Sequence, residues 1–146
     1  MTRILFICHG NICRSPMAEA VMKHLVSTVG RDSEFEIASC ATSTEEIGHP
    51  VYPAAQRELA RHGIPCPARR AVRLSHADYA QYDLLVCMER YNLRNALSLL
   101  GGDPDGKLRL LLPERDVADP WYSDDFDTAF RDIEEPGFSA MLRTVS

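Results

Sequence analysis

Apolar runs alternate with amphipathic stretches along the chain. Four of the apolar runs predict strands, near residues 3–7, 35–39, 83–88 and 107–112. Stretches with helical spacing lie between and after them, near residues 16–29, 52–62 and 91–100 and from about residue 123 onward. Strands that alternate with helices are typical of an α/β fold with a parallel sheet. The pattern therefore predicts an open sheet of about four parallel strands flanked by helices.

Local signals mark several of the expected boundaries. Gly63 follows the second helical stretch, where a helix commonly ends. Residues 101–106 have the composition of a loop, and residues 78–82 could form a short helical turn. Pro136-Gly137 interrupts the terminal pattern, so we expect the last helix to break there. Because no repeat or linker interrupts the chain, we expect one domain that spans residues 1–146.

Composition narrows the class of protein. The chain is 45% hydrophobic with a net charge of −5, which is ordinary for a soluble protein and argues against nucleic acid or an anionic membrane as partner. We expect no signal peptide, because the N-terminus leads directly into a strand. No apolar run approaches the about 20 residues that span a bilayer. Five scattered cysteines form neither a disulfide framework nor a zinc pattern, which predicts reduced thiols and a cytoplasmic location.

The segment after the first predicted strand carries the strongest chemical signal. The apolar run Ile4–Ile7 stops at Cys8, a six-residue loop runs to Arg14, and Ser15-Pro16 opens the next helix. A loop of this length can turn its backbone N–H groups inward around an anion, and the helix N-terminus adds positive potential there. Arg14 can bind two phosphate oxygens with its planar guanidinium. The segment therefore predicts a phosphate-binding loop after the first strand.

Cys8 lies at the base of this loop and is the candidate nucleophile. A helix N-terminus and a nearby cation stabilise a thiolate, and Ser15 can donate a hydrogen bond that helps the thiolate leave. Gly10 and Asn11 tolerate backbone angles that most residues avoid. A bare Cys-x5-Arg pattern also fits a buried structural cysteine beside a surface arginine. The preceding strand, the intervening residues and the following helix favour phosphate chemistry instead.

The run from Cys8 to Glu19, Cys-His-Gly-Asn-Ile-Cys-Arg-Ser-Pro-Met-Ala-Glu, resembles the signature of the low-molecular-weight protein tyrosine phosphatases. The resemblance extends over nearly the whole chain. It implies an enzyme that hydrolyses phosphotyrosine through a phosphocysteine intermediate, with no metal and no other cofactor. It also implies that the loop residues contact the substrate phosphate, namely His9, Gly10, Asn11, Ile12, Cys13 and Ser15, with Arg14 as a catalytic residue.

The segment 117–122, Val-Ala-Asp-Pro-Trp-Tyr, holds the candidate general acid. By resemblance, Asp119 protonates the leaving tyrosine oxygen and then activates water, a contribution of about 10²–10⁴-fold. Trp121 and Tyr122 would line a slot that admits an aryl phosphate. Taken alone, Asp-Pro would begin a turn and the two aromatics would pack in a minor core. Other nearby acids are more typical of a solvated face or of helix-start charges: Asp116, Asp124, Asp125 and Asp127.

The resemblance also assigns supporting positions. Ser39, at the end of the second predicted strand, would join Asn11 and Ser15 in a hydrogen-bond network that holds the loop rigid. Many family members have a histidine near Arg69-Arg70 that helps hold Asn11, and this chain has none there. Residues 44–47 lack the aromatic that the family often has facing the substrate. One wall of the slot is therefore not defined by the sequence.

Cys13 carries two interpretations, and four other positions are assigned more simply. Cys13 follows Cys8 by five residues, and family members use this cysteine to trap the oxidised nucleophile as a reversible disulfide. A small apolar filler under the loop is an equally good interpretation, and both can hold. Glu89 replaces the aspartate that the family usually has after the third strand. The remaining cysteines are interpreted as packing residues: Cys40, Cys66 and Cys87.

Two related activities and one binding role remain as alternatives. Thiol-dependent arsenate reductases share the fold and the loop but need two further, closely spaced cysteines, whereas Cys87 is the last cysteine here and has no near partner. Protein arginine phosphatases resemble this chain but place a threonine where Ile12 stands. A module that only binds phosphate has no need of Cys8. The expected partner is a phosphotyrosine protein, such as a bacterial tyrosine kinase or a host protein after export, and the expected state is a monomer.

Overall fold

The central sheet of the protein is parallel throughout. The computed structural model describes residues 1–66 and 68–134. Its four strands lie in the order β2-β1-β3-β4, and every neighbouring pair is parallel. The strands are β1 (Thr2–Cys8), β2 (Phe35–Ala41), β3 (Leu84–Cys87) and β4 (Leu108–Leu110). The predicted α/β fold with about four parallel strands is therefore confirmed.

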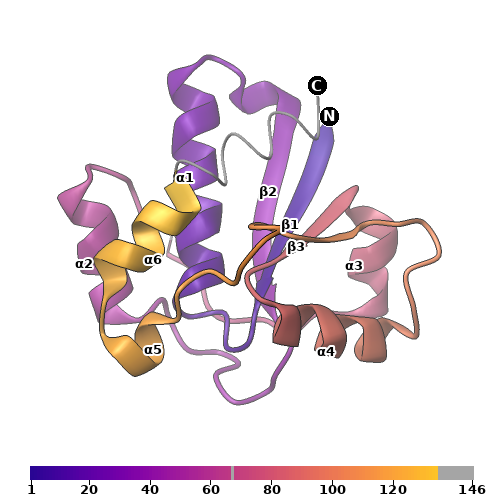
Figure 1. Cartoon of the computed structure of the whole chain (residues 1–146). Helices are drawn as coiled ribbons and strands as arrows, with labels where there is room; N and C mark the ends of the chain where they lie inside the picture. Colours follow the sequence, from indigo (N-terminus) through magenta and orange to yellow (C-terminus); the bar gives the residue numbers. More distant parts are fainter. Residues whose placement is uncertain (67, 135–146) are drawn as a thin grey trace.

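Helices cover both faces of this sheet (Figure 1). Three lie on one side: α1 (Arg14–Thr28), α2 (Pro53–Arg61) and α6 (Phe126–Asp132). Two lie on the other side: α3 (His76–Gln81) and α4 (Arg90–Leu100). A short 3₁₀ turn, η1 (Asp32–Glu34), precedes β2, and α5 (Pro120–Ser123) precedes α6. None of the helices in the described ranges combines the length and apolar character that crossing a bilayer requires.

Strand β1 contributes to both layers of the core. Ile4 and Phe6 pack in the cluster formed with α1, α2 and α6, whereas Leu5 and Ile7 pack in the cluster on the opposite face. Successive side chains of a strand point to opposite faces, so a sheet covered on both sides needs an unbroken apolar run. This requirement explains why the first strand could be predicted from the sequence. Cys8 is the last residue of that strand and lies at its carboxyl end.

The strand order places Cys8 where α/β sheets usually bind ligands. The chain leaves β1 for β2 on one side and then passes to β3 on the other side of β1. Ligands bind beyond the carboxyl ends of the strands at such a reversal. The loop between β1 and α1 therefore lies at the preferred edge of the sheet, at the bottom of the view in Figure 1.

The C-terminal helical region differs from the prediction. The sequence predicts one helical stretch from about residue 123, but helix α5 already begins at Pro120. The Asp119 side chain accepts a hydrogen bond from the Trp121 backbone N–H at 3.0 Å, and Pro120 occupies the first helical position. Asp before Pro is a helix-start signal as well as a turn signal. The sequence analysis considered only the turn, and the structure shows a helix start.

A second helix start follows immediately. Asp124 adopts φ 60°, which ends α5. Asp125 then caps α6 by accepting a hydrogen bond from the Thr128 backbone N–H at 3.0 Å. The break predicted at Pro136-Gly137 lies outside the described residues. The acidic residues after Asp119 thus include a helix cap, as the sequence suggested.

Candidate active site

The loop after β1 holds Cys8 at its base. Asn11 adopts φ 60°, a left-handed conformation that asparagine tolerates better than most residues. This conformation brings the Asn11 backbone N–H to 3.2 Å from Cys8 Sγ. Helix α1 begins at Arg14, two residues before the predicted start at Pro16, so its N-terminus follows the loop directly. The cysteine, inward N–H group and helix N-terminus expected from the sequence come together here.

A buried hydrogen-bond network surrounds the Ser15 hydroxyl. Asn11 Nδ2 donates to Ser15 Oγ at 2.8 Å and to Ser39 Oγ at 3.0 Å. Ser39 in turn donates to Glu19 Oε1 at 2.6 Å. Because the Asn11 amide fills an acceptor position on the Ser15 oxygen, the Ser15 hydroxyl is available to donate to Cys8 Sγ at 2.9 Å. The structure brings Asn11, Ser15 and Ser39 together as the resemblance implied.

Arg69 completes the network from the opposite side of Asn11. Arg69 Nη2 donates to Asn11 Oδ1 at 2.7 Å and to the Ser39 carbonyl at 3.0 Å, and Arg69 Nε lies 3.5 Å from Glu19 Oε1. The Val72 backbone N–H also donates to Asn11 Oδ1, at 3.2 Å. Sequence analysis found a missing histidine in this region but did not find its replacement. The available signal was the arginine itself, a polar donor in the same segment.

Replacing Arg69 tests this support. We expect Arg69→Met to lower kcat about ten-fold or more, because a buried hydrogen bond from a charged donor contributes about 1.5–3 kcal/mol and Asn11 Oδ1 would lose the shorter of its two hydrogen bonds. Arg69→His should retain more activity than Arg69→Met. Steady-state rates report the effect on the loop, and thermal unfolding shows whether the variant is still folded. Arg70→Met is the matched control, because Arg70 donates to the Gly48 carbonyl instead. An unchanged kcat in Arg69→Met would contradict the assignment.

Arg14 is buried and held by three segments. Its Nη1 donates to the Val117 carbonyl at 3.0 Å, and its Nη2 donates to Glu89 Oε1 at 3.0 Å and to Asp119 Oδ2 at 3.4 Å. Burial alone would lower the pKa of Arg14, but the Glu89 hydrogen bond and the nearby negative groups raise that pKa above its ordinary value. The guanidinium therefore stays charged beside Cys8. Sequence analysis noted Glu89 as a departure from the family but did not assign it this contact.

Asp119 lies between the phosphate loop and solvent. Its Oδ1 caps α5 through the Trp121 backbone N–H, and its Oδ2 faces Arg14. The side chain is 28% exposed, so it can exchange protons with water. Among the described contacts, the carboxylates paired with Arg14 belong to Asp119 and Glu89. Three of the rival acids named from sequence have other partners: Asp116 accepts from the Arg90 backbone N–H, Asp125 from Thr128, and Asp127 pairs with Arg131.

The rim near residues 44–47 is polar, with the exposed ring of Tyr91 beside it. His9 Nε2 lies 3.1 Å from Glu45 Oε2, and the His9 ring centroid lies 6.2 Å from that of Tyr91. Gly10 faces Glu46 closely, because a Cβ added to the glycine would lie 3.3 Å from Glu46 Cγ. The position left open by the missing aromatic is thus bordered by a histidine and two carboxylates.

The opposite rim is aromatic. Trp121 is 53% exposed, and its ring centroid lies 5.3 Å from that of Tyr52. Tyr52 also donates its backbone N–H to the Ile12 carbonyl at 2.8 Å. The Ile12 side chain is buried in the core under α1 and α2. The side chain of Tyr122 lies outside the described part of the structure. Tyr52 is a residue that sequence analysis did not connect with the site.

Cys13 is buried beneath the loop. Burial raises the pKa of its thiol to about 12, and the nearby Cys8 and Asp119 charges contribute in the same direction. The thiol is therefore protonated at neutral pH and packs in the main core cluster. This environment agrees with the filler role that the sequence suggested.

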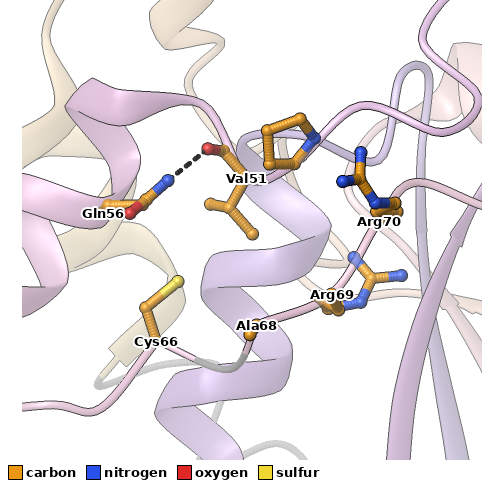
Figure 2. Close-up of a pocket in the computed structure, with 7 residues that line it drawn as sticks. Val51, Gln56, Cys66, Ala68, Arg69 and Arg70 are labelled. Atoms are coloured by element: carbon orange, nitrogen blue, oxygen red, sulfur yellow. Dashed lines mark hydrogen bonds between the residues drawn. The ribbon is translucent and has the colours of Figure 1, made fainter.

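A separate hollow of about 370 Å³ lies beside α2 (Figure 2). Its lining residues are Pro50, Val51, Gln56, Cys66, Ala68, Arg69 and Arg70. None of Cys8, Arg14 and Asp119 lines it, so it is distinct from the candidate active site. In the described ranges, the residues close enough to hold a metal ion together are Glu58, His62 and Asp127. That group includes no residue of the phosphate loop.

Sequence comparison extends over most of the chain. A family model described as low molecular weight phosphotyrosine protein phosphatase matches residues 3–144. The human protein of that description is 36% identical over 138 residues, which cover 85% of this chain and 82% of the human protein. The Bacillus subtilis low molecular weight protein-tyrosine-phosphatase YfkJ is 32% identical over 133 residues, which cover 87% of this chain and 85% of YfkJ.

Solved structures show the same fold. The crystal structure of YfkJ superposes with a TM-score of 0.92 at 29% identity and covers 99% of this chain and 94% of that chain. The crystal structure of SP-PTP, a low molecular weight protein tyrosine phosphatase from Streptococcus pyogenes, also has a TM-score of 0.92, at 31% identity. It covers 100% of this chain and 95% of its own.

Proposed function

Because the chain belongs to the low molecular weight phosphotyrosine protein phosphatase family and is an enzyme of that family, we propose that it hydrolyses phosphotyrosine through a phosphocysteine on Cys8. The observation that carries the proposal is the arrangement around Cys8 Sγ. The Asn11 N–H and the Ser15 hydroxyl lie at 3.2 and 2.9 Å from the sulfur. Arg14 is held between the loop and Asp119. A nucleophile, an anion-binding group and an acid therefore converge.

The first step transfers the phosphoryl group to sulfur. The Cys8 thiolate attacks phosphorus in line, the S–P bond forms, and the bond between phosphorus and the tyrosine oxygen breaks. The loop N–H groups and Arg14 stabilise the charge on the three equatorial oxygens, which is the largest expected contribution. Asp119 gives its proton to the departing phenolate oxygen. The free tyrosine side chain then leaves.

The second step releases phosphate. Asp119, now a carboxylate, takes a proton from the water that attacks phosphorus, and the S–P bond breaks. Ser15 donates its hydroxyl proton as a hydrogen bond to the returning thiolate. The network from Ser15 through Asn11 to Ser39 favours this direction of donation. The sequence of steps requires no metal and no cofactor.

Substrate choice is tested by one panel of rates. The wild-type protein should hydrolyse para-nitrophenyl phosphate in EDTA and should prefer a phosphotyrosine peptide over phosphoarginine and phosphoserine peptides. Ile12→Thr, which introduces the residue found in protein arginine phosphatases, should raise relative activity on phosphoarginine. A wild-type preference for phosphoarginine would move the function to that sister activity. Loss of all turnover in EDTA would contradict the metal-free mechanism.

Oxidation provides a second test of the loop. Peroxide should inactivate the enzyme, and thiol reductant should restore it, because Cys13 can capture oxidised Cys8 as a disulfide. Cys13→Ser should recover less activity after the same treatment. Burial raises the pKa of the Cys13 thiol, so its thiolate fraction grows with pH and capture should accelerate as pH rises. Equal recovery of mutant and wild type would refute the trapping role.

The proposal extends to the cellular setting. The substrate is a phosphotyrosine protein, such as a bacterial tyrosine kinase, and the enzyme works as a cytoplasmic monomer with residues 1–146 as one domain. The net charge of −5 favours this setting over nucleic acid or an anionic membrane surface. Size-exclusion chromatography with light scattering would report the monomer directly.

A further inference from the structure

Two aromatic side chains at the rim stay exposed despite their size. Tyr52 is 37% exposed and Trp121 is 53% exposed, and their rings meet edge to face with centroids 5.3 Å apart and an interplanar angle of 63°. Beneath them, the buried Phe126 ring stacks on Tyr52 with centroids 6.0 Å apart at 12°. The pair, here called the aromatic ledge (Tyr52 and Trp121), therefore presents contiguous apolar area to solvent.

The aromatic ledge connects the two halves of the active site. The Tyr52 backbone N–H is bonded to the Ile12 carbonyl of the phosphate loop, and the Trp121 backbone N–H is bonded to Asp119. Tyr52 immediately precedes α2 and Trp121 lies in α5, and these two helices lie near each other in Figure 1. A group that lies on the ledge is thus next to both the nucleophile loop and the acid.

The Tyr52 part of the ledge is rigid before any ligand arrives. Pro53 fixes the first position of α2, and the Tyr52 backbone hydrogen bond ties the preceding residue to the loop. Stacking on Phe126 holds the Tyr52 ring from below. Binding to a surface that is already ordered loses little conformational entropy, and tyrosine and tryptophan supply large contact area at low entropic cost.

We propose that the aromatic ledge is a subsite for a large apolar side chain next to the phosphotyrosine of a peptide substrate. This inference rests on the proposed function. With the phosphoryl group at Cys8 and the tyrosine oxygen at Asp119, the peptide backbone emerges at the rim. One side of that rim carries Glu45 and Glu46, which offer charge, and the other side carries the ledge. An apolar residue next to the phosphotyrosine therefore gains more contact on the ledge than beside Glu45 and Glu46.

The test compares phosphotyrosine peptides that differ at one neighbouring position, which is Ala, Leu or Phe, placed before or after the phosphotyrosine. For the wild type, we expect kcat/KM for the Leu or Phe peptide to exceed that for the Ala peptide by about five- to ten-fold on one side of the phosphotyrosine. In Tyr52→Ala, this ratio should fall to near one. Tyr52→Phe should keep the ratio, because the ring and not the hydroxyl forms the surface.

The matched control is Tyr91→Ala, which removes an exposed tyrosine on the His9 side of the rim and should keep the ratio. A wild-type ratio near one at both neighbouring positions would overturn the subsite. A preserved ratio in Tyr52→Ala, or an equal loss in Tyr91→Ala, would do the same. Wild-type hydrolysis of para-nitrophenyl phosphate and the Ala peptide is measured alongside. If the wild type hydrolyses neither substrate, the proposed function is wrong and so is the subsite. If it hydrolyses both, the ratios test the subsite alone.

Discussion

Cys8→Ser should lower kcat by at least about 10⁴-fold with every phosphate ester tried. The serine hydroxyl is not ionised at neutral pH and is a much weaker nucleophile than a thiolate. Removal of the nucleophile from an otherwise intact site lowers the rate by about this factor or more. The Asn11 N–H and the Arg14 guanidinium stay in place, so the variant should still bind inorganic phosphate. Steady-state rates on para-nitrophenyl phosphate measure the loss, and calorimetry measures the binding.

The control for this variant is Cys66→Ser, which changes a cysteine that lines the separate hollow beside α2. We expect its kcat to stay within about two-fold of wild type, because most substitutions away from a site have small effects. If Cys8→Ser retained turnover comparable to this control, Cys8 would not be the nucleophile and the mechanism would fail. Retained phosphate binding without turnover in Cys8→Ser is the result that separates catalysis from folding.

Asp119→Asn should lower kcat by about 10²–10³-fold on phosphotyrosine peptides, because the leaving phenolate loses its proton donor. The loss should be smaller on para-nitrophenyl phosphate, whose leaving group needs less help. Asparagine keeps the side-chain oxygen that caps α5, so the short helix should persist. Rates for a series of aryl phosphates of rising leaving-group pKa measure the effect.

Asp124→Asn is the matched control for the acid. Asp124 follows α5 and has φ 60°, which asparagine tolerates well, so this variant changes a nearby charge without straining the backbone. It should have a near wild-type rate on every aryl phosphate. An Asp119→Asn variant whose rate depends on the leaving group just as the wild type's does would show that Asp119 is not the acid.

The strands and the phosphate loop could be predicted because the residues that define each of them lie close together in the sequence. An unbroken apolar run such as Ile4–Ile7 is required wherever a strand is covered on both faces. The loop combined a nucleophile, residues that tolerate unusual backbone angles and a helix start within a short segment. Ser39 was reached only through the resemblance, since a strand-end serine carries no signal of its own. Its contact with Asn11 spans 28 residues.

What sequence analysis missed depends on contacts between distant segments. Arg69 reaches Asn11 across 58 residues, and Glu89 reaches Arg14 across 75. Tyr52 joins the rim because α2 begins beside the loop, which no spacing in the chain reveals. Helix α5 was a different case, because its cap was local but the same Asp-Pro pair also begins turns.

Formation of phosphocysteine on Cys8 is the central claim, and trapping it is the most direct measurement. Asp119→Asn should slow the attack of water, so the intermediate should accumulate during turnover of para-nitrophenyl phosphate. Rapid alkaline quenching followed by peptide mass spectrometry should then find one phosphoryl group on the peptide that contains Cys8, with a burst of para-nitrophenol of matching size. Unmodified protein without a burst, or a phosphoryl group on another residue, would contradict the account.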